Sequence, residues 1–426
     1  MKIPEATFAK RLTLLSACLF AIPSSYSAAQ FGTLYRFGGY PDGANPYAGV
    51  VIGNGVLYGT TYAGGSQAYG TVFSLVPPTS SGGSWTEVIL HSFADFNGTD
   101  GANPQSTVAI GGGGVLYGTT FYGGGLPTCG LGCGTVFSLT PPTAGGAWTE
   151  SSIHLFGAPL DGGAVAAPVV IGKDGVLYGT APVGGISGWG LVFALVPPAS
   201  AGGSWTEKIL YNFQGGTDGF SPGPVAIGDN GVLYGLTYGG SSNNGTAFSL
   251  APPASAGGSW TKTVLYSFGG TPDASPGLGM GLAIARDGVL YGAATGGGAA
   301  GFGAVFALRP PSDANGAWSE QVLYSFSGGN DGAQPYAGVT IGTRGTLYGT
   351  TRFGGPANYG TVYSLTPPAS RSGSWSETVL HSFTGAADGG FPAGVLAIDN
   401  HSRLYGTTEG TGVGTAANGT VFAVMP

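Results

Sequence analysis

Short runs of apolar residues alternate with Gly-rich and Pro-rich turns along the chain, and the same order of runs returns seven times. A Leu-Tyr-Gly triplet marks each return, centred on Tyr58, Tyr117, Tyr178, Tyr234, Tyr291, Tyr348 and Tyr405. The intervals between these tyrosines are 59, 61, 56, 57, 57 and 57 residues. A period this regular predicts one supersecondary unit that packs against copies of itself.

Each unit contains four segments that are typical of short strands. In the unit around Tyr348 they span residues 337–341, 346–351, 361–368 and 375–383, and they are rich in Val, Leu, Tyr, Phe and Thr. Clusters of Gly, Pro, Asn and Asp separate them, which is the strand signature. The strands are apolar on both faces, as expected of a sheet packed between two neighbouring sheets. Four antiparallel strands in a unit of this length favour the blade of a propeller over the coil of a solenoid.

The two ends of the chain predict how the ring closes. The segment Phe31–Phe37 matches the fourth strand of the other units, and the last unit stops after its third strand at Pro426. We therefore expect an all-β fold: a seven-bladed β-propeller whose N-terminal strand completes the C-terminal blade. The alternative is an open stack of sheets with two bare edges. The glycine after each tyrosine is expected to let backbones approach closely near the axis.

The first residues have the composition of a secretory signal. Lys2, Lys10 and Arg11 precede an apolar stretch, and small residues follow. This order predicts a signal peptide over residues 1–29, a single propeller domain over 30–426, and a secreted or periplasmic location. A lipoprotein processing box ending at Cys18 is the alternative. No stretch has the unbroken apolar length of a transmembrane segment.

Composition narrows the partners. Charged residues make up 8% of the chain, the formal net charge is −7, and no basic stripe is present, so nucleic acid is not an expected partner. We expect a monomer without a cofactor. In an oxidising compartment Cys129 and Cys133, which lie in one loop, predict a local disulfide. A metal site there is the weaker alternative, because two thiols fall short of four ligands.

Most titratable residues occupy repeat positions, which favours structural roles. One aspartate per unit lies in the loop before the first strand: Asp42, Asp100, Asp161, Asp218, Asp273, Asp331 and Asp388. Such residues are expected to accept hydrogen bonds from nearby backbone N–H groups. Five glutamates follow a tryptophan by two residues: Glu87, Glu150, Glu207, Glu320 and Glu377. His91, His154 and His381 stand where other units have tyrosine, so we expect them to replace an aromatic strand residue.

Two positions vary among the units while their surroundings do not. Four residues after each key tyrosine lie Tyr62, Phe121, Pro182, Tyr238, Thr295, Arg352 and Glu409, here called the first variable position. Before the glycine that opens the third strand lie Tyr69, Cys133, Trp189, Asn244, Phe302, Tyr359 and Asn418, the second variable position. Both flank the loop between the second and third strands, which should share a face with the Asp-bearing loops. Loops on a rigid frame are where recognition usually lies.

These positions supply the candidate ligand-binding residues, because exposed aromatic rings stack on sugars or pack on apolar partners. The candidates are Tyr62, Tyr69, Phe121, Trp189, Tyr238, Phe302, Arg352, Tyr359 and Glu409. The alternative is that these rings merely cover neighbouring glycine loops. No catalytic residues are predicted, since no nucleophile–base order or paired-carboxylate spacing stands out.

The repeated phrases DGANP, GVLYGTTYAGG, GTVFSL and WTEVILHSF resemble the tandem repeat called GloVer, found in exported bacterial proteins and named for Gloeobacter and Verrucomicrobia. The resemblance covers Phe31 to Pro426. The order of strands is also similar to that of NHL-type propeller repeats. The resemblance implies a propeller and export, and it carries no activity with it.

Three functions are compatible with these patterns. The first is a secreted or periplasmic interaction module that binds glycan or protein through the aromatic loop face. The second is a structural component of the cell surface without a small ligand. The third is a hydrolase or lactonase with a cation in the central tunnel, held by neutral oxygens of the residues before the repeat prolines, Asn45, Asn103, Ser221, Ser275 and Gln334. An enzyme is the least expected of the three.

Overall fold

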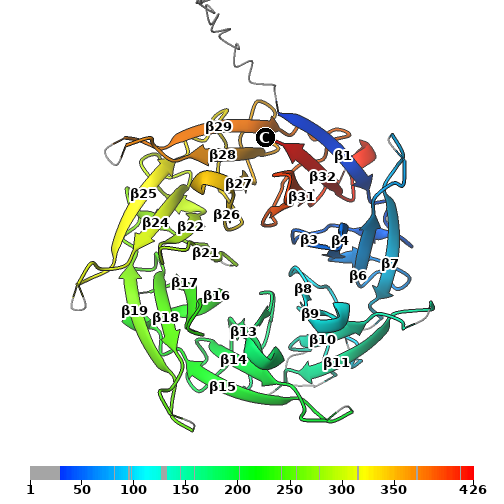
Figure 1. Cartoon of the computed structure of the whole chain (residues 1–426), viewed down its shortest axis with the longest axis horizontal. Coiled ribbons are helices and arrows are strands. Elements are labelled where there is room, and N and C mark those ends of the chain that lie inside the picture. Colours follow the sequence, from blue (N-terminus) through cyan, green and yellow to red (C-terminus); the bar gives the residue numbers. More distant parts are fainter. Residues whose placement is uncertain are drawn as a thin grey trace, which may run out of the picture.

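The computed structural model describes residues 29–426, apart from residues 81, 95, 97, 126–131, 144, 158, 201, 241, 256, 278, 314–315, 371–372 and 413. Seven four-stranded antiparallel sheets surround a central axis, with their innermost strands toward the middle of the ring (Figure 1). The predicted seven-bladed propeller is thus confirmed. The predicted signal peptide and the alternative processing site at Cys18 lie outside the described residues, except for Ala29.

Blades 1 to 3 follow the expected strand order from axis to rim. Blade 1 comprises β3 (Val51–Gly53), β4 (Val56–Thr61), β6 (Thr71–Val76) and β7 (Thr86–Ser92). Blade 2 comprises β8 (Ala109–Ile110), β9 (Leu116–Thr120), β10 (Thr135–Thr140) and β11 (Thr149–Leu155). Blade 3 comprises β12 (Val170–Ile171), β13 (Leu177–Ala181), β14 (Leu191–Val196) and β15 (Thr206–Asn212).

Blades 4 to 6 repeat this arrangement. Blade 4 comprises β16 (Phe220–Ile227), β17 (Leu233–Gly239), β18 (Thr246–Ala251) and β19 (Thr261–Ser267). Blade 5 comprises β21 (Leu282–Ile284), β22 (Leu290–Ala294), β24 (Ala304–Arg309) and β25 (Ser319–Ser325). Blade 6 comprises β26 (Thr340–Ile341), β27 (Leu347–Thr351), β28 (Thr361–Thr366) and β29 (Ser376–Ser382).

Short elements decorate the loops. Two-residue strands pair β2 (Gly43–Ala44) with β5 (Ala63–Gly64), and β20 (Ala274–Ser275) with β23 (Gly296–Gly297). Single 3-10 turns are η1 (Gly112–Gly114), η3 (Lys173–Gly175), η4 (Gly216–Asp218), η5 (Thr343–Gly345) and η6 (Gly414–Ala416). None of the helical segments that the structure describes is long and apolar enough to cross a bilayer.

Blade 7 joins the two ends of the chain. It contains β30 (Ala397–Ile398), β31 (Leu404–Thr408), β32 (Thr420–Met425) and, as its outermost strand, β1 (Gln30–Arg36). β1 pairs antiparallel with β32 from Gln30 opposite Met425 to Arg36 opposite Thr420, and the two strands lie side by side in Figure 1. The ring therefore closes as predicted, and the open stack is excluded.

The Leu-Tyr-Gly triplet has a different packing role from the one expected. A Cβ on Gly59 would come within 2.6 Å of the Phe73 ring, and the other triplet glycines likewise adjoin the aromatic ring of the third strand of their own blade. The glycine therefore makes room for a ring, and the prediction of close backbone contact at this position was wrong. Backbones do approach closely at Gly49 and Gly394, where blades 1 and 7 meet and any side chain would collide with the neighbouring main chain.

The tyrosine of the triplet packs against the next blade. Tyr58 lies edge-on to Trp148 with ring centroids 6.2 Å apart, and four other triplet tyrosines meet a tryptophan of the following blade edge-on, while Tyr234 meets Trp318 at a tilt. Tyr348 instead shares a core cluster with Ala29, which precedes the closing strand. Aromatic pairs of this kind contribute about 0.5–1.5 kcal/mol each beyond the apolar area they bury. The repeat thus encodes contacts between blades as well as strands within them.

A polar contact accompanies each of these apolar ones. At every junction the Asp of the connecting loop accepts a hydrogen bond from a backbone N–H just after the preceding blade, as from Gly38 to Asp42 at 2.6 Å. The same Asp bonds to a tyrosine hydroxyl or a histidine ring on the fourth strand, as Tyr35 does at 3.1 Å. Both predictions, of turn-stabilising aspartates and of histidines in tyrosine positions, are confirmed.

The glutamate of the following blade faces the same Asp at five junctions. Burial, and the charge of the Asp, raise the pKa of Glu87, Glu150 and Glu377 to about 7, and that of Glu320 to about 8. Oε1 of Glu320 is buried and has no hydrogen-bond donor. These glutamates therefore hold a proton in the folded ring at pH values where a free glutamate is ionised.

The ring should therefore be most stable at mildly acidic pH. Raised glutamate pKa values stabilise the fold below about pH 4.5 and lose this contribution as pH rises to about 8, because the folded state binds more protons than the unfolded chain. Hydrogen bonds lower the pKa of Asp331 and Asp388, and their contribution is lost below about pH 4. Thermal unfolding followed by circular dichroism should show a maximum near pH 5 and a fall of several degrees by pH 8.5.

Glu320→Gln is the matched variant for this prediction. The amide keeps the size of the side chain and cannot ionise, so the fall in melting temperature between pH 5 and pH 8.5 should become shallower than in the wild type. A melting temperature that rises steadily from pH 5 to pH 8.5 in the wild-type protein would contradict the assignment.

Candidate functional site

The loop face is the face formed by the loops between the second and third strands and by the Asp-bearing loops between blades. The backbone at both variable positions is fixed by hydrogen bonds between blades. Tyr62 N–H donates to the carbonyl of Asn45 at 3.0 Å, and Asn103 N–H donates to the carbonyl of Tyr69 at 2.8 Å. Equivalent bonds recur at most other junctions. The side chains at these positions thus differ from blade to blade, whereas the main-chain conformation there stays the same.

The residue before each repeat proline takes part in these hydrogen bonds between blades. Asn45 and Asn103 both have φ near +55°, in the left-handed region that costs energy for a residue with a side chain. Their side-chain amides donate to main-chain carbonyls, Asn45 to Glu409 at 2.9 Å and Asn103 to Tyr62 at 2.8 Å. These residues, expected as oxygen ligands of a tunnel cation, serve in this structure to connect neighbouring blades.

Rings at the second variable position lie over glycines of the adjacent inter-blade loop. A Cβ on Gly215 would come within 3.0 Å of the Trp189 indole, and Phe302 covers Gly328 and Tyr359 covers Gly385 in the same way. Trp189 and Phe302 nevertheless keep 46% and 45% of their surface exposed. The covering role, which the sequence offered as the alternative, is therefore present, and part of each ring remains available to solvent.

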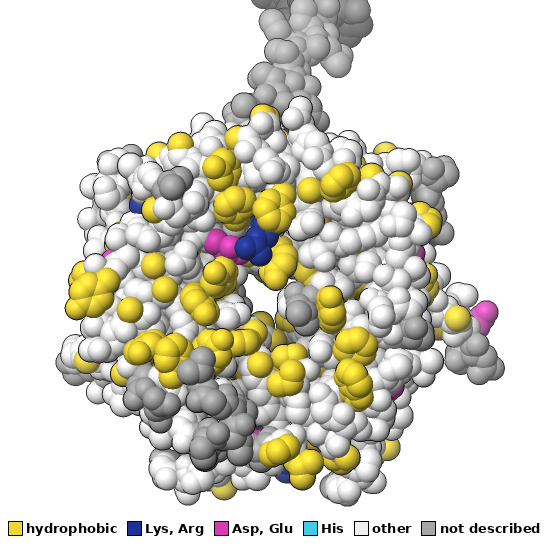
Figure 2. All heavy atoms as spheres, turned by 180° about the vertical axis from the view of Figure 1, so that it is seen from behind, with side chains coloured by type: hydrophobic (Ala, Val, Ile, Leu, Met, Phe, Trp, Pro, Cys, Tyr) yellow, Lys and Arg dark blue, Asp and Glu magenta, His cyan; other side chains and the backbone are white. Residues whose placement is uncertain are grey.

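The candidate aromatic residues do not gather in one pocket. Neighbouring rings connect Tyr69 through Phe96 and Tyr122 to Phe121 at the junction of blades 1 and 2. Trp189 contacts Phe220, which in turn faces Tyr238, at the junction of blades 3 and 4. Figure 2 shows hydrophobic side chains in separate groups over this face of the molecule. The second variable position of one blade thus meets the first of the next.

The two charged candidates form an ion pair. Arg352 Nη2 donates to Glu409 Oε2 at 2.7 Å, from the ends of β27 and β31 on adjacent blades. Glu409 is 6% exposed, and burial raises its pKa to about 7 against the opposing influence of Arg352. Glu409 Oε1 and Arg352 Nε are both buried without a hydrogen-bond partner. In Figure 2 a basic and an acidic group touch each other beside the central opening, among hydrophobic side chains.

Aromatic rings surround this ion pair. The Arg352 guanidinium carbon lies 4.9 Å from the centre of the Tyr336 ring and 5.8 Å from that of Phe353. Tyr47 packs edge-on against Tyr62 at 5.1 Å, and its pKa is raised by burial and then by the charge of Glu409. We call the set Tyr47, Tyr62, Tyr336, Arg352, Phe353 and Glu409 the mouth cluster.

The sequence identified Tyr62, Arg352 and Glu409 of the mouth cluster and missed its other members. Tyr47 and Tyr336 each follow a repeat proline, at a position where Gln105 and Gly277 stand in other units. Variation at that position was the signal that could have found them. Phe353 follows Arg352 directly and stands outside both variable positions.

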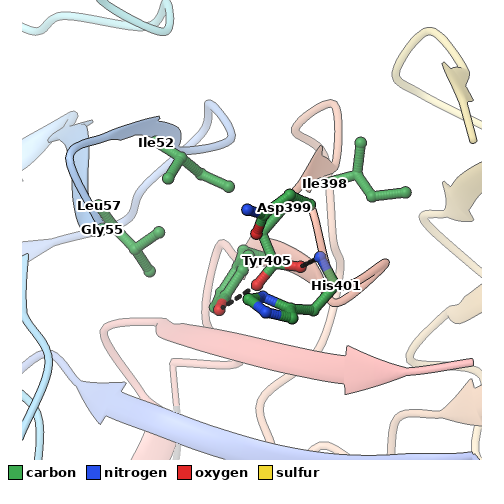
Figure 3. Close-up of a pocket in the computed structure, with 8 residues that line it drawn as sticks. Ile52, Gly55, Leu57, Ile398, Asp399, His401 and Tyr405 are labelled. Carbon is green, nitrogen blue, oxygen red and sulfur yellow. Dashed lines mark hydrogen bonds between the residues drawn. The ribbon is translucent and has the colours of Figure 1, made fainter.

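A cavity lies between blades 7 and 1, near the hairpin turns that join the first and second strands of these blades. This cavity of about 480 Å³ is lined by Ile52, Leu57, Ile398, His401 and Tyr405, among others. Figure 3 shows Asp399 at its centre, turned toward its own hairpin. Its carboxylate accepts hydrogen bonds from the N–H groups of His401 and Arg403 and from the Tyr405 hydroxyl. Asp399 therefore stabilises a turn, and the site offers no free charged group from it.

The wall near the axis is apolar where a cavity adjoins it. A cavity of about 320 Å³ against the inner strands of blades 7 and 1 is lined by Val50, Val51, Ile52, Val395, Leu396, Ala397, Ile398 and Thr107. None of these is a carboxylate, which hard cations prefer as ligands. In the loop of blade 2, Cys133 is buried and disulfide-bonded, while Cys129 lies outside the described residues.

The fold and the loop face together define a propeller that carries its variable side chains on one end of a closed ring. The Gloeobacter/Verrucomicrobia repeat matches residues 19–248, 128–319 and 281–426. The chain belongs to this repeat family, as the resemblance in the sequence predicted. No curated protein matches the chain.

Solved structures share the architecture at low identity. The extracellular domain of a protein assigned as a one-component system of B. thetaiotaomicron is 12% identical with a TM-score of 0.56, covering 94% of this chain and 42% of that one. A Thermus thermophilus protein assigned as an oxidoreductase (glucose dehydrogenase) is 13% identical with a TM-score of 0.45, covering 93% and 100%. A protein assigned as a gluconolactonase is 14% identical with a TM-score of 0.41, covering 75% and 88%. At these identities the first likeness shows the fold, and the other two add nothing to it.

The ion pair of the mouth cluster gives a test of its own. Arg352→Met should destabilise the protein by about 1–3 kcal/mol, because the buried Glu409 carboxyl group loses the hydrogen bond from Arg352. The double variant Arg352→Met/Glu409→Gln should recover most of that loss, since it removes both charges. Urea unfolding of the two variants measures the difference. Equal stability of the single and double variants would show that the two side chains are not coupled.

Proposed function

We propose that the protein is an exported binding module that recognises carbohydrate through the mouth cluster on its loop face. The observation that carries this proposal is the Arg352–Glu409 ion pair enclosed by tyrosine and phenylalanine rings. Export rests on the signal-like composition of residues 1–29. No cofactor or catalytic group enters the proposal.

The chemistry of the mouth cluster suits a neutral ligand rich in hydroxyl groups. Glu409 fixes one edge of the guanidinium and neutralises it, while 28% of the Arg352 side chain remains exposed. Arginine offers five N–H donors in a rigid plane, and those not used by Glu409 suit sugar oxygens. Tyr336, which is 38% exposed, presents an aromatic ring for the C–H side of a sugar. A few fixed polar groups among aromatic rings are typical of ligand sites.

The frame is rigid in the way that recognition requires. Main-chain hydrogen bonds between blades hold both variable positions, so a ligand need not order them on binding. Preorganised contacts of this kind lower the entropic cost of association. The rings at the second variable position would extend the surface for a longer chain.

Tyr336→Ala should weaken glycan binding at least tenfold and lower the melting temperature little, because the ring is exposed and its cation–π contact with Arg352 lies near the surface. Screening on a glycan array, followed by calorimetry with the best ligand, measures the effect. Tyr40→Ala is the matched control: Tyr40 is a more exposed tyrosine, at 71%, outside the mouth cluster. Equal binding by both variants and the wild type would refute the assignment of the mouth cluster.

A structural role at the cell surface is the competing function, and the rings that cover glycines at the second variable position favour it. That role predicts that the wild-type protein is retained on no polysaccharide and shows no change in melting temperature with any sugar. Retention on at least one polysaccharide, lost in Tyr336→Ala, decides for the binding module.

A further inference from the structure

We propose that His154, Asp161 and Glu207 bind a divalent transition-metal ion of the zinc type at the junction between blades 2 and 3. His154 lies on β11, Asp161 in the loop that follows, and Glu207 on β15 of the next blade. Among the residues that the structure describes, this is the one group of three His, Cys, Asp or Glu side chains whose ligand atoms all lie within 4.8 Å of one another. A metal ion bound there would cross-link blades 2 and 3.

The geometry fits tetrahedral coordination. His154 Nε2 is 3.1 Å from Asp161 Oδ1 and 3.8 Å from Glu207 Oε1. Zinc bonds to nitrogen and oxygen of about 2.0–2.2 Å place neighbouring ligand atoms about 3.3 Å apart, so the observed distances fall on either side of the required one. A nitrogen with two carboxylate oxygens is a donor set that zinc, cobalt and nickel accept.

The surroundings orient the ligands, and the site is partly open to solvent. The His154 ring packs edge-on against Phe156 at 4.5 Å, and Asp161 Oδ2 accepts a hydrogen bond from Gly157 N–H at 3.1 Å. Glu207 Oε1 is buried and lacks any hydrogen-bond donor in the described structure. The three side chains keep 18–19% of their surface exposed, which gives solvent access for the ion and for a water ligand.

The other junctions show why this one is different. At blades 1 and 2 the pair His91–Asp100 is present, but the Ser152 hydroxyl donates to Glu150 Oε1 at 3.1 Å. The equivalent of Ser152 beside Glu207 is Ile209, which has no donor.

The remaining junctions each lack a ligand type. At blades 6 and 7 the Phe31 ring stacks on His381 where a glutamate would stand. At blades 3 and 4, Lys262 replaces the glutamate and forms an ion pair with Asp218. The last three junctions carry tyrosine in place of histidine. The complete set of three ligands thus arises where one histidine replacement coincides with a glutamate that has no donor.

The experiment compares two histidine variants in tag-free protein stripped with a chelator. Wild-type protein should bind one Zn²⁺ per chain by calorimetry, gain a few degrees in melting temperature, and give visible absorption bands with Co²⁺. His154→Tyr should lose all three signals and keep its fold, because tyrosine is the residue that other junctions use to bond the same Asp.

His91→Tyr is the matched control and should bind zinc like the wild type. Glu207→Gln, which keeps the His154–Asp161 contact, should also lose the Co²⁺ bands. A zinc-dependent rise in melting temperature that persists in His154→Tyr, or wild-type protein that binds no zinc at micromolar concentration, would overturn the proposal. Sugar binding by the mouth cluster is independent of either result.

Discussion

The pairing of β1 with β32 is the contact on which the rest of the ring depends. A four-stranded blade is apolar on both faces, so it is stable only with a neighbour on each side, and a chain of such blades leaves two bare ends unless it closes. β1 supplies the missing outer strand of blade 7 from the start of the chain. Phe31 on β1 then stacks on His381 of blade 6 at 3.6 Å and joins the core of the last two blades. One strand therefore completes a sheet and also the last contact between sheets.

Polar residues also occupy the junctions between blades in the closed ring. Each junction contains a half-buried Asp that accepts hydrogen bonds from its own loop and from a tyrosine or histidine of the preceding blade. A second acidic group beside it would repel the first, and burial together with this repulsion raises the pKa of Glu87, Glu150, Glu320 and Glu377. Lys262 solves the same problem differently, with an ion pair to Asp218 under the Phe213 and Phe248 rings. Although the chain has few charged residues, the same polar arrangement around an Asp therefore recurs at every junction.

The sequence predicted the architecture because the repeat indicates both the strands within each blade and the pairing of the two ends of the ring. Seven copies of one strand pattern gave the blade count, and the match of residues 31–37 to a fourth strand gave the closure. The role of the triplet glycine could not be predicted, since a ring across the strand and a backbone across the axis both require the absence of a side chain. The grouping of the candidate rings at the junctions of blades 1 and 2 and of blades 3 and 4 could not be predicted, because it depends on Phe96 in a loop and on Phe220 at the start of β16, which stand outside the two variable positions.

In a closed ring of repeats, a residue whose type differs from that of its counterparts in the other blades has a predictable neighbour. The same position on the next blade lies beside it, one period further along the chain. Arg352 and Glu409 are 57 residues apart and share the first variable position, so a charge introduced on one blade is balanced by the opposite charge on the next. Neither would be stable alone at a site where Glu409 is 6% exposed. The pair therefore couples two adjacent blades, because a change of either side chain alone leaves the other without its partner.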